Sequence, residues 1–170
     1  MVNLNLESDN SENIEELKTE IVSKRNQGEV LFEITKIIPK PSAASRSIQP
    51  SEDEDIAAVI DSFIRQQGCY NIGDRWREIS KEEAEQILKF IMIKDLAYSV
   101  ELMTPQEAQQ ISSKLLSIFT GNCKFFTNAS FVDNYSGMSE WDSITESTFD
   151  TGVIIVSPDR IGMLWVKDED

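Results

Sequence analysis

Histidine is missing from this sequence of 170 residues. Without an imidazole, the chain has no Ser-His-Asp or Cys-His nucleophile, no histidine general base and no histidine-ligated metal. Cysteine is nearly missing too, since Cys69 and Cys123 are the only two, too few for an all-cysteine zinc site. A disulfide between them stays open, but we expect two reduced thiols that pack as small apolar side chains in a reducing compartment.

Long hydrophobic runs and phosphate-binding glycine motifs are also lacking. No stretch approaches the roughly 18 apolar residues of a membrane span, and residues 1–10 lack the basic and apolar regions of a secretory signal. Neither a GxGxxG pattern, nor a P-loop, nor EF-hand spacing occurs. The sequence therefore predicts a cytoplasmic protein with no membrane partner and no cofactor.

Basic residues are scarce: 16 Lys and Arg stand against 30 Asp and Glu, which gives a formal net charge of −14. Such a charge repels nucleic acids and anionic lipid, which bind through Lys and Arg, and it attracts cationic partners. From residue 133 onward there are nine acidic side chains and only two bases, Arg160 and Lys167. We therefore expect an acidic pole in the C-terminal part, although solubility alone is a sufficient reason for the net charge.

The N-terminal part has a different character from the rest of the chain. Residues 1–13 are polar and are expected to form a mobile tail. Apolar residues then recur at helical spacing over 14–21, and residues 30–35 alternate as in a strand. Prolines bound a Ser-rich linker at residues 37–50. The sequence thus predicts an N-terminal part, residues 1–50, and a main domain, residues 51–170, and leaves open whether the first packs on the second.

Capping boxes mark the starts of three helices in the main domain. In a capping box, a Ser or Thr hydroxyl accepts from the N3 amide while a Glu three residues on reaches back to the cap amide. The pairs are Ser51 with Glu54, Ser80 with Glu83, and Thr104 with Glu107. Apolar residues at helical spacing follow each pair.

The pattern changes after Gly121, where strands replace helices. We expect strands at 123–126 and 141–149, and then a hairpin of two wholly apolar strands, 153–156 and 161–166. Pro158 and Asp159 suit the turn of that hairpin. Helices first and meandering strands last predict an α+β fold, with helices packed on one face of a C-terminal antiparallel sheet.

Candidate binding residues lie in and beside the polar segment 127–137. As a loop between two expected strands, it offers the hydrogen-bonding side chains Asn128, Asp133, Asn134 and Tyr135. The expected strand 141–149 and its neighbours supply the other candidates, Glu140, Trp141, Asp142, Glu146 and Asp150. In this hypothesis the acids steer a basic partner and the aromatic residues supply contact area. The simpler alternatives are a turn-rich surface loop, a core tryptophan and acids that keep a sheet edge soluble.

The C-terminal quarter resembles short uncharacterised bacterial proteins. The resemblance is carried by Phe125-Phe126-Thr127-Asn128, by Thr148-Phe149-Asp150-Thr151-Gly152, and by Gly162-Met163-Leu164-Trp165-Val166 with the acidic end. It implies a bacterial origin and a compartment, but no activity. The small, acidic, histidine-free chain is also similar in class to bacterial toxin-immunity proteins.

These observations favour a non-catalytic protein-binding or regulatory protein, of the inhibitor or immunity type, that engages a basic partner. Two alternatives stay open. The first is an enzyme with a carboxylate-bound Mg²⁺ or a carboxylate acid–base pair. The second is a small-molecule binder with an apolar pocket between the helices and the sheet. The oligomeric state does not follow from the sequence.

Overall fold

A computed structural model describes residues 4–9, 11–39 and 52–169 of the chain. The strands are β1 (Leu4–Ser8), β2 (Glu29–Pro39), β3 (Arg77–Ile79), β4 (Lys124–Thr127), β5 (Ala129–Val132), β6 (Gly137–Trp141), β7 (Phe149–Val156) and β8 (Arg160–Asp168). The helices are α1 (Glu12–Lys24), α2 (Glu52–Gln66), α3 (Lys81–Ile93) and α4 (Pro105–Ile118). Six strands form one antiparallel sheet in the order β1-β2-β8-β7-β4-β3, and β5 pairs with β6 in a separate two-stranded sheet.

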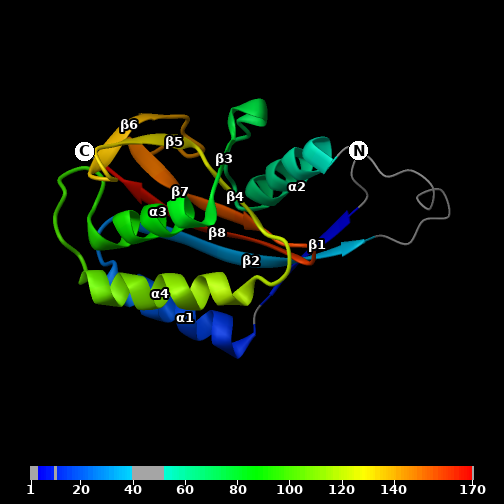
Figure 1. Cartoon of the computed structure of the whole chain (residues 1–170), viewed down its shortest axis with the longest axis horizontal. Coiled ribbons are helices and arrows are strands. Elements are labelled where there is room, and N and C mark those ends of the chain that lie inside the picture. Colours follow the sequence, from blue (N-terminus) through cyan, green and yellow to red (C-terminus); the bar gives the residue numbers. More distant parts are fainter. Residues whose placement is uncertain (1–3, 10, 40–51, 170) are drawn as a thin grey trace.

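Helices cover both faces of the six-stranded sheet. On one face lie α1, α3 and α4 (Figure 1), where Leu88 and Ile111 pack in one core with Val153. On the other face α2 places Phe63 in a second core with Ile154. Because neighbouring residues of a strand point to opposite faces, the unbroken apolar run of β7 needs cover on both sides. The predicted α+β fold is confirmed; α1, α3 and α4 share one face of the sheet, whereas α2, expected on that same face, packs on the opposite one.

The N-terminal segment belongs to the same sheet as the C-terminal strands. The strand expected at 30–35 is confirmed as β2, which pairs with β8 over Glu29–Lys36. The expectation of a tail is wrong for residues 4–8, because they form β1 on the outer edge of β2. The linker expected at 37–50 is wrong for residues 37–39, which belong to β2, and residues 40–50 lie outside the described residues. The segments 4–9 and 11–39 therefore pack on the main domain.

Two of the three predicted capping boxes lie within the described residues and are confirmed. The Ser80 hydroxyl accepts from the Glu83 amide at 3.1 Å, and the Thr104 hydroxyl accepts from the Glu107 amide at 3.1 Å. In both cases the glutamate side chain also accepts from the cap amide. Ser51 lies outside the described residues.

Removal of the Thr104 hydroxyl is expected to lower the free energy of unfolding by about 1 kcal/mol, because the first turn of α4 then loses its acceptor. The substitution is Thr104→Ala, and urea unfolding followed by circular dichroism measures it. Gln110→Ala, at an exposed site in the middle of the same helix, is the matched control and should change the value by less than about 0.5 kcal/mol. Equal effects of the two substitutions would contradict the role of the cap.

The predicted hairpin of apolar strands is confirmed as β7 and β8, which pair from Phe149–Asp168 to Val156–Ile161. The expected strand at 123–126 corresponds to β4. By contrast, the polar segment 127–137, expected as a loop, contributes β5 and the turn of the β5–β6 hairpin.

The strand expected at 141–149 is wrong. β6 ends at Trp141 and β7 begins at Phe149; between them residues 142–143 are irregular and residues 144–148 form bends. The cause is the side chain of Asp150, whose carboxylate accepts from the Ile144 amide at 3.1 Å and from the Thr145 hydroxyl at 2.9 Å. A side chain that binds the preceding backbone in this way competes with strand pairing.

Candidate functional site

Asp150 is a buried structural acid at the start of β7. Besides the two bonds to Ile144 and Thr145, its Oδ1 accepts from the Trp165 indole N–H at 3.0 Å. Buried carboxylates persist in proteins only when such donors satisfy them. The prediction that Asp150 steers a partner is therefore wrong, because its side chain does not reach solvent; it holds residues 142–148 in place instead.

Asn128, between β4 and β5, is buried as well. Its Nδ2 donates to the carbonyls of Asp142 at 2.9 Å and Asp150 at 3.0 Å, and its Oδ1 accepts from the Thr151 hydroxyl at 2.8 Å. The amide thus joins the base of the β5–β6 hairpin to β7. Its predicted role in partner binding is wrong, because these internal bonds occupy a side chain with only 2% exposure.

The remaining candidates of segment 127–137 form the turn of the β5–β6 hairpin. Asp133, Asn134 and Tyr135 have φ angles of 37°, 57° and 62°, a left-handed run that costs energy in residues other than glycine. Asp133 and Asn134 are exposed. Tyr135 is half-buried against Phe131, with ring centroids 5.5 Å apart. The hairpin thus presents Asp133 and Asn134 to solvent and keeps Tyr135 against the body.

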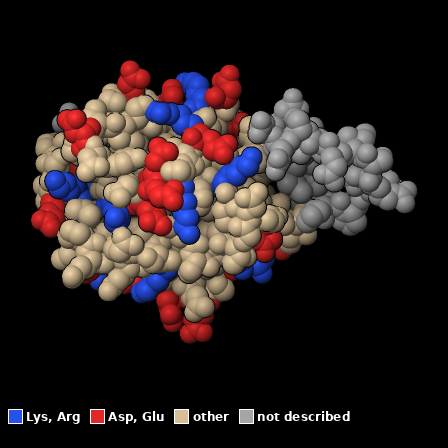
Figure 2. Space-filling model, in the orientation of Figure 1, with Lys and Arg blue, Asp and Glu red and all other residues tan. Residues whose placement is uncertain are grey.

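Glu140, Trp141 and Asp142 do not form the expected acidic face. Glu140 is exposed on β6, Trp141 is half-buried against Phe149 with ring centroids 5.4 Å apart, and Asp142 accepts from Arg75 at 2.9 Å. Figure 2 shows red and blue side chains interspersed over the face that it displays. The expected acidic sheet face is wrong for two reasons: its strand does not form, and β7 and β8 are buried on both sides.

Among the acidic residues predicted to bind a partner, Glu146 is the one that lies near other acidic side chains. It lines a hollow of about 460 Å³ together with Glu29, Lys167 and Glu169, and we call these four residues the acidic hollow. They come from the start of β2, the segment 142–148 and the end of β8, and they meet because Glu29 and Lys167 are opposite each other in the β2–β8 register. The end of β8, which carries Lys167, lies near the mark of the C-terminus in Figure 1.

Hydrogen bonds fix the charged groups of the acidic hollow. Lys167 Nζ lies 2.9 Å from Glu29 Oε2, and this bond raises the pKa of Lys167 above its ordinary value. The Thr148 hydroxyl donates to Glu169 at 2.9 Å, and this bond lowers the pKa of the Glu169 carboxyl, so the group is ionised at neutral pH. The hollow therefore holds three carboxylates against one ammonium.

Tyr70, an exposed side chain beside the hollow, donates its hydroxyl to Glu146 at 3.0 Å. This bond and the negative charge of Glu146 raise the pKa of Tyr70. Glu146→Gln should therefore bring the pKa of Tyr70 back toward its ordinary value, because the amide carries no charge. A pH titration of ¹³Cζ-labelled tyrosine by NMR measures it, with Glu140→Gln as the matched control. An unchanged pKa of Tyr70 in Glu146→Gln would contradict the contact.

A buried ion pair anchors the end of β8 at the acidic hollow. Arg25 Nη2 lies 2.7 Å from Asp168 Oδ2, with side-chain exposures of 0% and 3%. Arg25 Nη1 donates to Asp168 Oδ1 at 3.2 Å, Arg25 Nε donates to the Ile91 carbonyl at 2.5 Å, and the Leu96 amide donates to Asp168 Oδ2 at 2.7 Å. Gly28 passes so close that a Cβ there would lie 1.9 Å from Asp168 Oδ1. This cluster joins α1, α3 and β8.

The sequence predictions missed Glu29, Lys167, Glu169 and Tyr70 as neighbours of Glu146. No local motif marks them, because Glu29 and Lys167 meet through the pairing of β2 with β8, and Tyr70 meets Glu146 through a bond between segments far apart in the sequence. The one available signal was Lys167, a rare base in the acidic C-terminal part. Such a base is expected to lie near acids that it can pair with.

Two further structural findings bear on possibilities that the sequence analysis considered. Among the residues whose side chains the structure describes, a set that leaves out the acidic run 52–55, no three or more Cys, Asp or Glu side chains are grouped so as to hold a metal ion. The hypothesis of a carboxylate-bound metal thus has no site among those described side chains. No described helix combines the length and apolar character needed to span a membrane.

Comparisons with known proteins identify no relative: no family model matches the sequence, and searches of curated proteins and of solved structures give no match.

Proposed function

We propose that this protein is a non-catalytic protein-binding module that takes a cationic side chain of a basic partner into the acidic hollow. The observation that carries the proposal is the convergence of Glu29, Glu146 and Glu169, from three separate segments, around one hollow that contains a single base, Lys167. The regulatory role that we propose for this binding is that of an inhibitor or an immunity-type protein.

The carboxylates of the hollow keep acceptor capacity for a ligand. A carboxylate has two oxygens and about four acceptor positions, whereas Glu146 uses one bond to the Tyr70 hydroxyl. Because Tyr70 and Thr148 hold Glu146 and Glu169 in fixed positions, less side-chain entropy is lost when a guanidinium or ammonium group enters. Tyr70, 51% exposed, adds the aromatic contact area that is common at energetically important positions of interfaces.

Other charges of the molecule act at longer range. The net charge of −14 speeds the encounter with a cationic protein and disfavours nucleic acids. In this proposal Asp133 and Glu140, exposed on the β5–β6 hairpin, contribute to steering rather than to the hollow itself. The two free thiols, Cys69 and Cys123, support placement in a reducing compartment, and we propose the bacterial cytoplasm.

The experiment compares the binding of proteins from a bacterial lysate by two charge-matched double variants. Glu146→Gln with Glu169→Gln changes the hollow, and Glu12→Gln with Glu15→Gln removes two exposed acids of α1. A partner that binds the unmodified protein at low salt, is released as salt rises, and is lost only from the hollow variant supports the proposal. Equal loss from both variants, or retention by both, would show that the hollow is not the binding site.

A further inference from the structure

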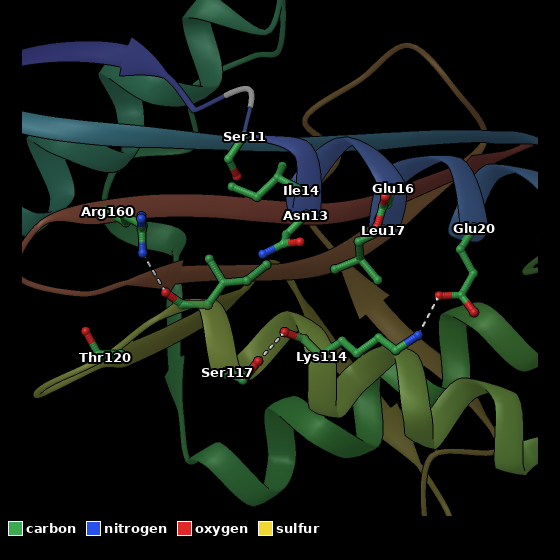
Figure 3. Close-up of a pocket in the computed structure, with 11 residues that line it drawn as sticks. Ser11, Asn13, Ile14, Glu16, Leu17, Glu20, Lys114, Ser117, Thr120 and Arg160 are labelled. Atoms are coloured by element: carbon green, nitrogen blue, oxygen red, sulfur yellow. Dashed lines mark hydrogen bonds and ion pairs between the residues drawn. The ribbon is translucent and has the colours of Figure 1, made fainter.

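A second hollow, of about 670 Å³, lies between α1 and α4 (Figure 3). Ile14 and Leu17 of α1 and Ile118 of α4 give it an apolar lining. Its size falls in the range of about 300–1,000 Å³ that is typical of small-molecule sites. This groove is separate from the acidic hollow, and none of its lining residues belongs to it.

Arg160 lies at one end of the groove and is held in a fixed orientation. Its Nε donates to Asp9 Oδ2 at 3.2 Å, and its Nη1 donates to the Ile118 carbonyl at 2.8 Å. Asp9 is itself buried, with a side-chain exposure of 4%. A guanidinium has five N–H donors, so these two bonds leave donors for a ligand. In Figure 3 the side chains of Ser11 and Asn13 extend toward this end of the groove.

Glu16 supplies the opposite charge on the α1 wall of the groove. Within the part of the chain that the structure describes, no cation pairs with it, since the nearby Lys114 is engaged by Glu20 at 3.1 Å. Asn13 and Glu16 are one helical turn apart, about 5 Å along the axis. The groove thus offers a guanidinium and a carboxylate that both retain bonding capacity, with apolar side chains between them.

We propose that this groove binds a short peptide with free termini and apolar side chains. Its carboxylate accepts from Arg160, its ammonium group donates to Glu16, and its side chains lie on Ile14, Leu17 and Ile118. Such a ligand has no net charge, so the protein's charge of −14 does not repel it. A simple anion is repelled by Asp9 and Glu16, and a simple cation is repelled by Arg160. Either therefore suits the groove less well than a ligand that carries both charges.

The first test uses the dipeptide Leu-Leu and two capped forms, N-acetyl-Leu-Leu and Leu-Leu-amide, in isothermal titration calorimetry with the full chain. Leu-Leu should bind, and each cap should weaken binding at least about tenfold, because a hydrogen bond between charged groups is lost. No binding of Leu-Leu at millimolar concentration, or equal binding of all three peptides, would overturn the proposal.

Matched variants locate the binding site. Glu16→Gln should weaken the binding of Leu-Leu and Leu-Leu-amide at least about tenfold but leave the binding of N-acetyl-Leu-Leu unchanged. Glu15→Gln, on the same helix outside the groove, should change the binding of none of them.

A second pair of variants tests the position of the groove. Ser117→Arg should block the groove, and Ser113→Arg, one turn earlier on α4 and also exposed, should not. Equal effects within either matched pair would overturn the assignment, and Glu16→Gln decides alone if an arginine variant fails to fold. None of these outcomes depends on the acidic hollow.

Discussion

Asp168→Asn is expected to lower the free energy of unfolding by about 3–5 kcal/mol, because it leaves the charge of Arg25 buried without a counter-charge. The side chain of Arg25 has 0% exposure, so water cannot replace the lost carboxylate. The substituted asparagine has nearly the same shape, and the loss therefore reports charge rather than packing. Chemical unfolding measured by tryptophan fluorescence gives the value.

A double variant separates the cost of the unpaired charge from the net contribution of the pair. Arg25→Met with Asp168→Leu removes both charges and fills the site with apolar side chains, and we expect it to be more stable than Asp168→Asn alone. Glu169→Gln, at the exposed neighbouring position, should change the free energy of unfolding by less than about 0.5 kcal/mol. A loss below about 1 kcal/mol in Asp168→Asn would contradict the buried pair.

Asp150→Ala is expected to lower the free energy of unfolding by at least about 3 kcal/mol, since each buried donor left without an acceptor costs about 1–3 kcal/mol. The donors are the Trp165 indole N–H, the Ile144 amide and the Thr145 hydroxyl. Glu140→Ala, at an exposed site on β6, is the control, with an expected change below about 0.5 kcal/mol.

The same substitution should also disturb the acidic hollow. Because the Asp150 carboxylate holds Ile144 and Thr145, its loss releases the segment that carries Glu146. The contact between Glu146 and the Tyr70 hydroxyl then weakens, and the pKa of Tyr70 should fall toward its ordinary value in folded Asp150→Ala. A stable Asp150→Ala variant with an unchanged pKa of Tyr70 would show that Asp150 does not position the segment.

Local patterns in the sequence predicted local structure well. The cap residues Ser80 and Thr104 act within four residues of themselves, and the turn at Pro158 and Asp159 joins adjacent strands. The failures involve distant partners. Residues 4–8 become a strand only because the edge of β2 pairs with them, and residues 142–148 leave the strand pattern because Asp150 binds their backbone and side chains.

The candidate site was predictable to a smaller extent. The acidic C-terminal part pointed to Glu146, but its neighbours Glu29 and Glu169 are brought together by the β2–β8 pairing, which no local pattern specifies. Asn128 and Asp150 looked like surface residues because polar side chains are mostly exposed. Their burial follows from mutual hydrogen bonds that the sequence does not show.

An NMR titration with the capped peptide acetyl-Arg-Arg-Arg-amide tests the role of the acidic hollow most directly, with acetyl-Gln-Gln-Gln-amide as the neutral control. Binding at the acidic hollow predicts that the largest amide shift changes occur at residues 28–29, 146–147 and 167–169, that salt reduces them, and that Glu146→Gln with Glu169→Gln abolishes them. Shift changes of similar size at Glu12, Glu15 and the β5–β6 hairpin, or a response that survives in the double variant, would contradict it.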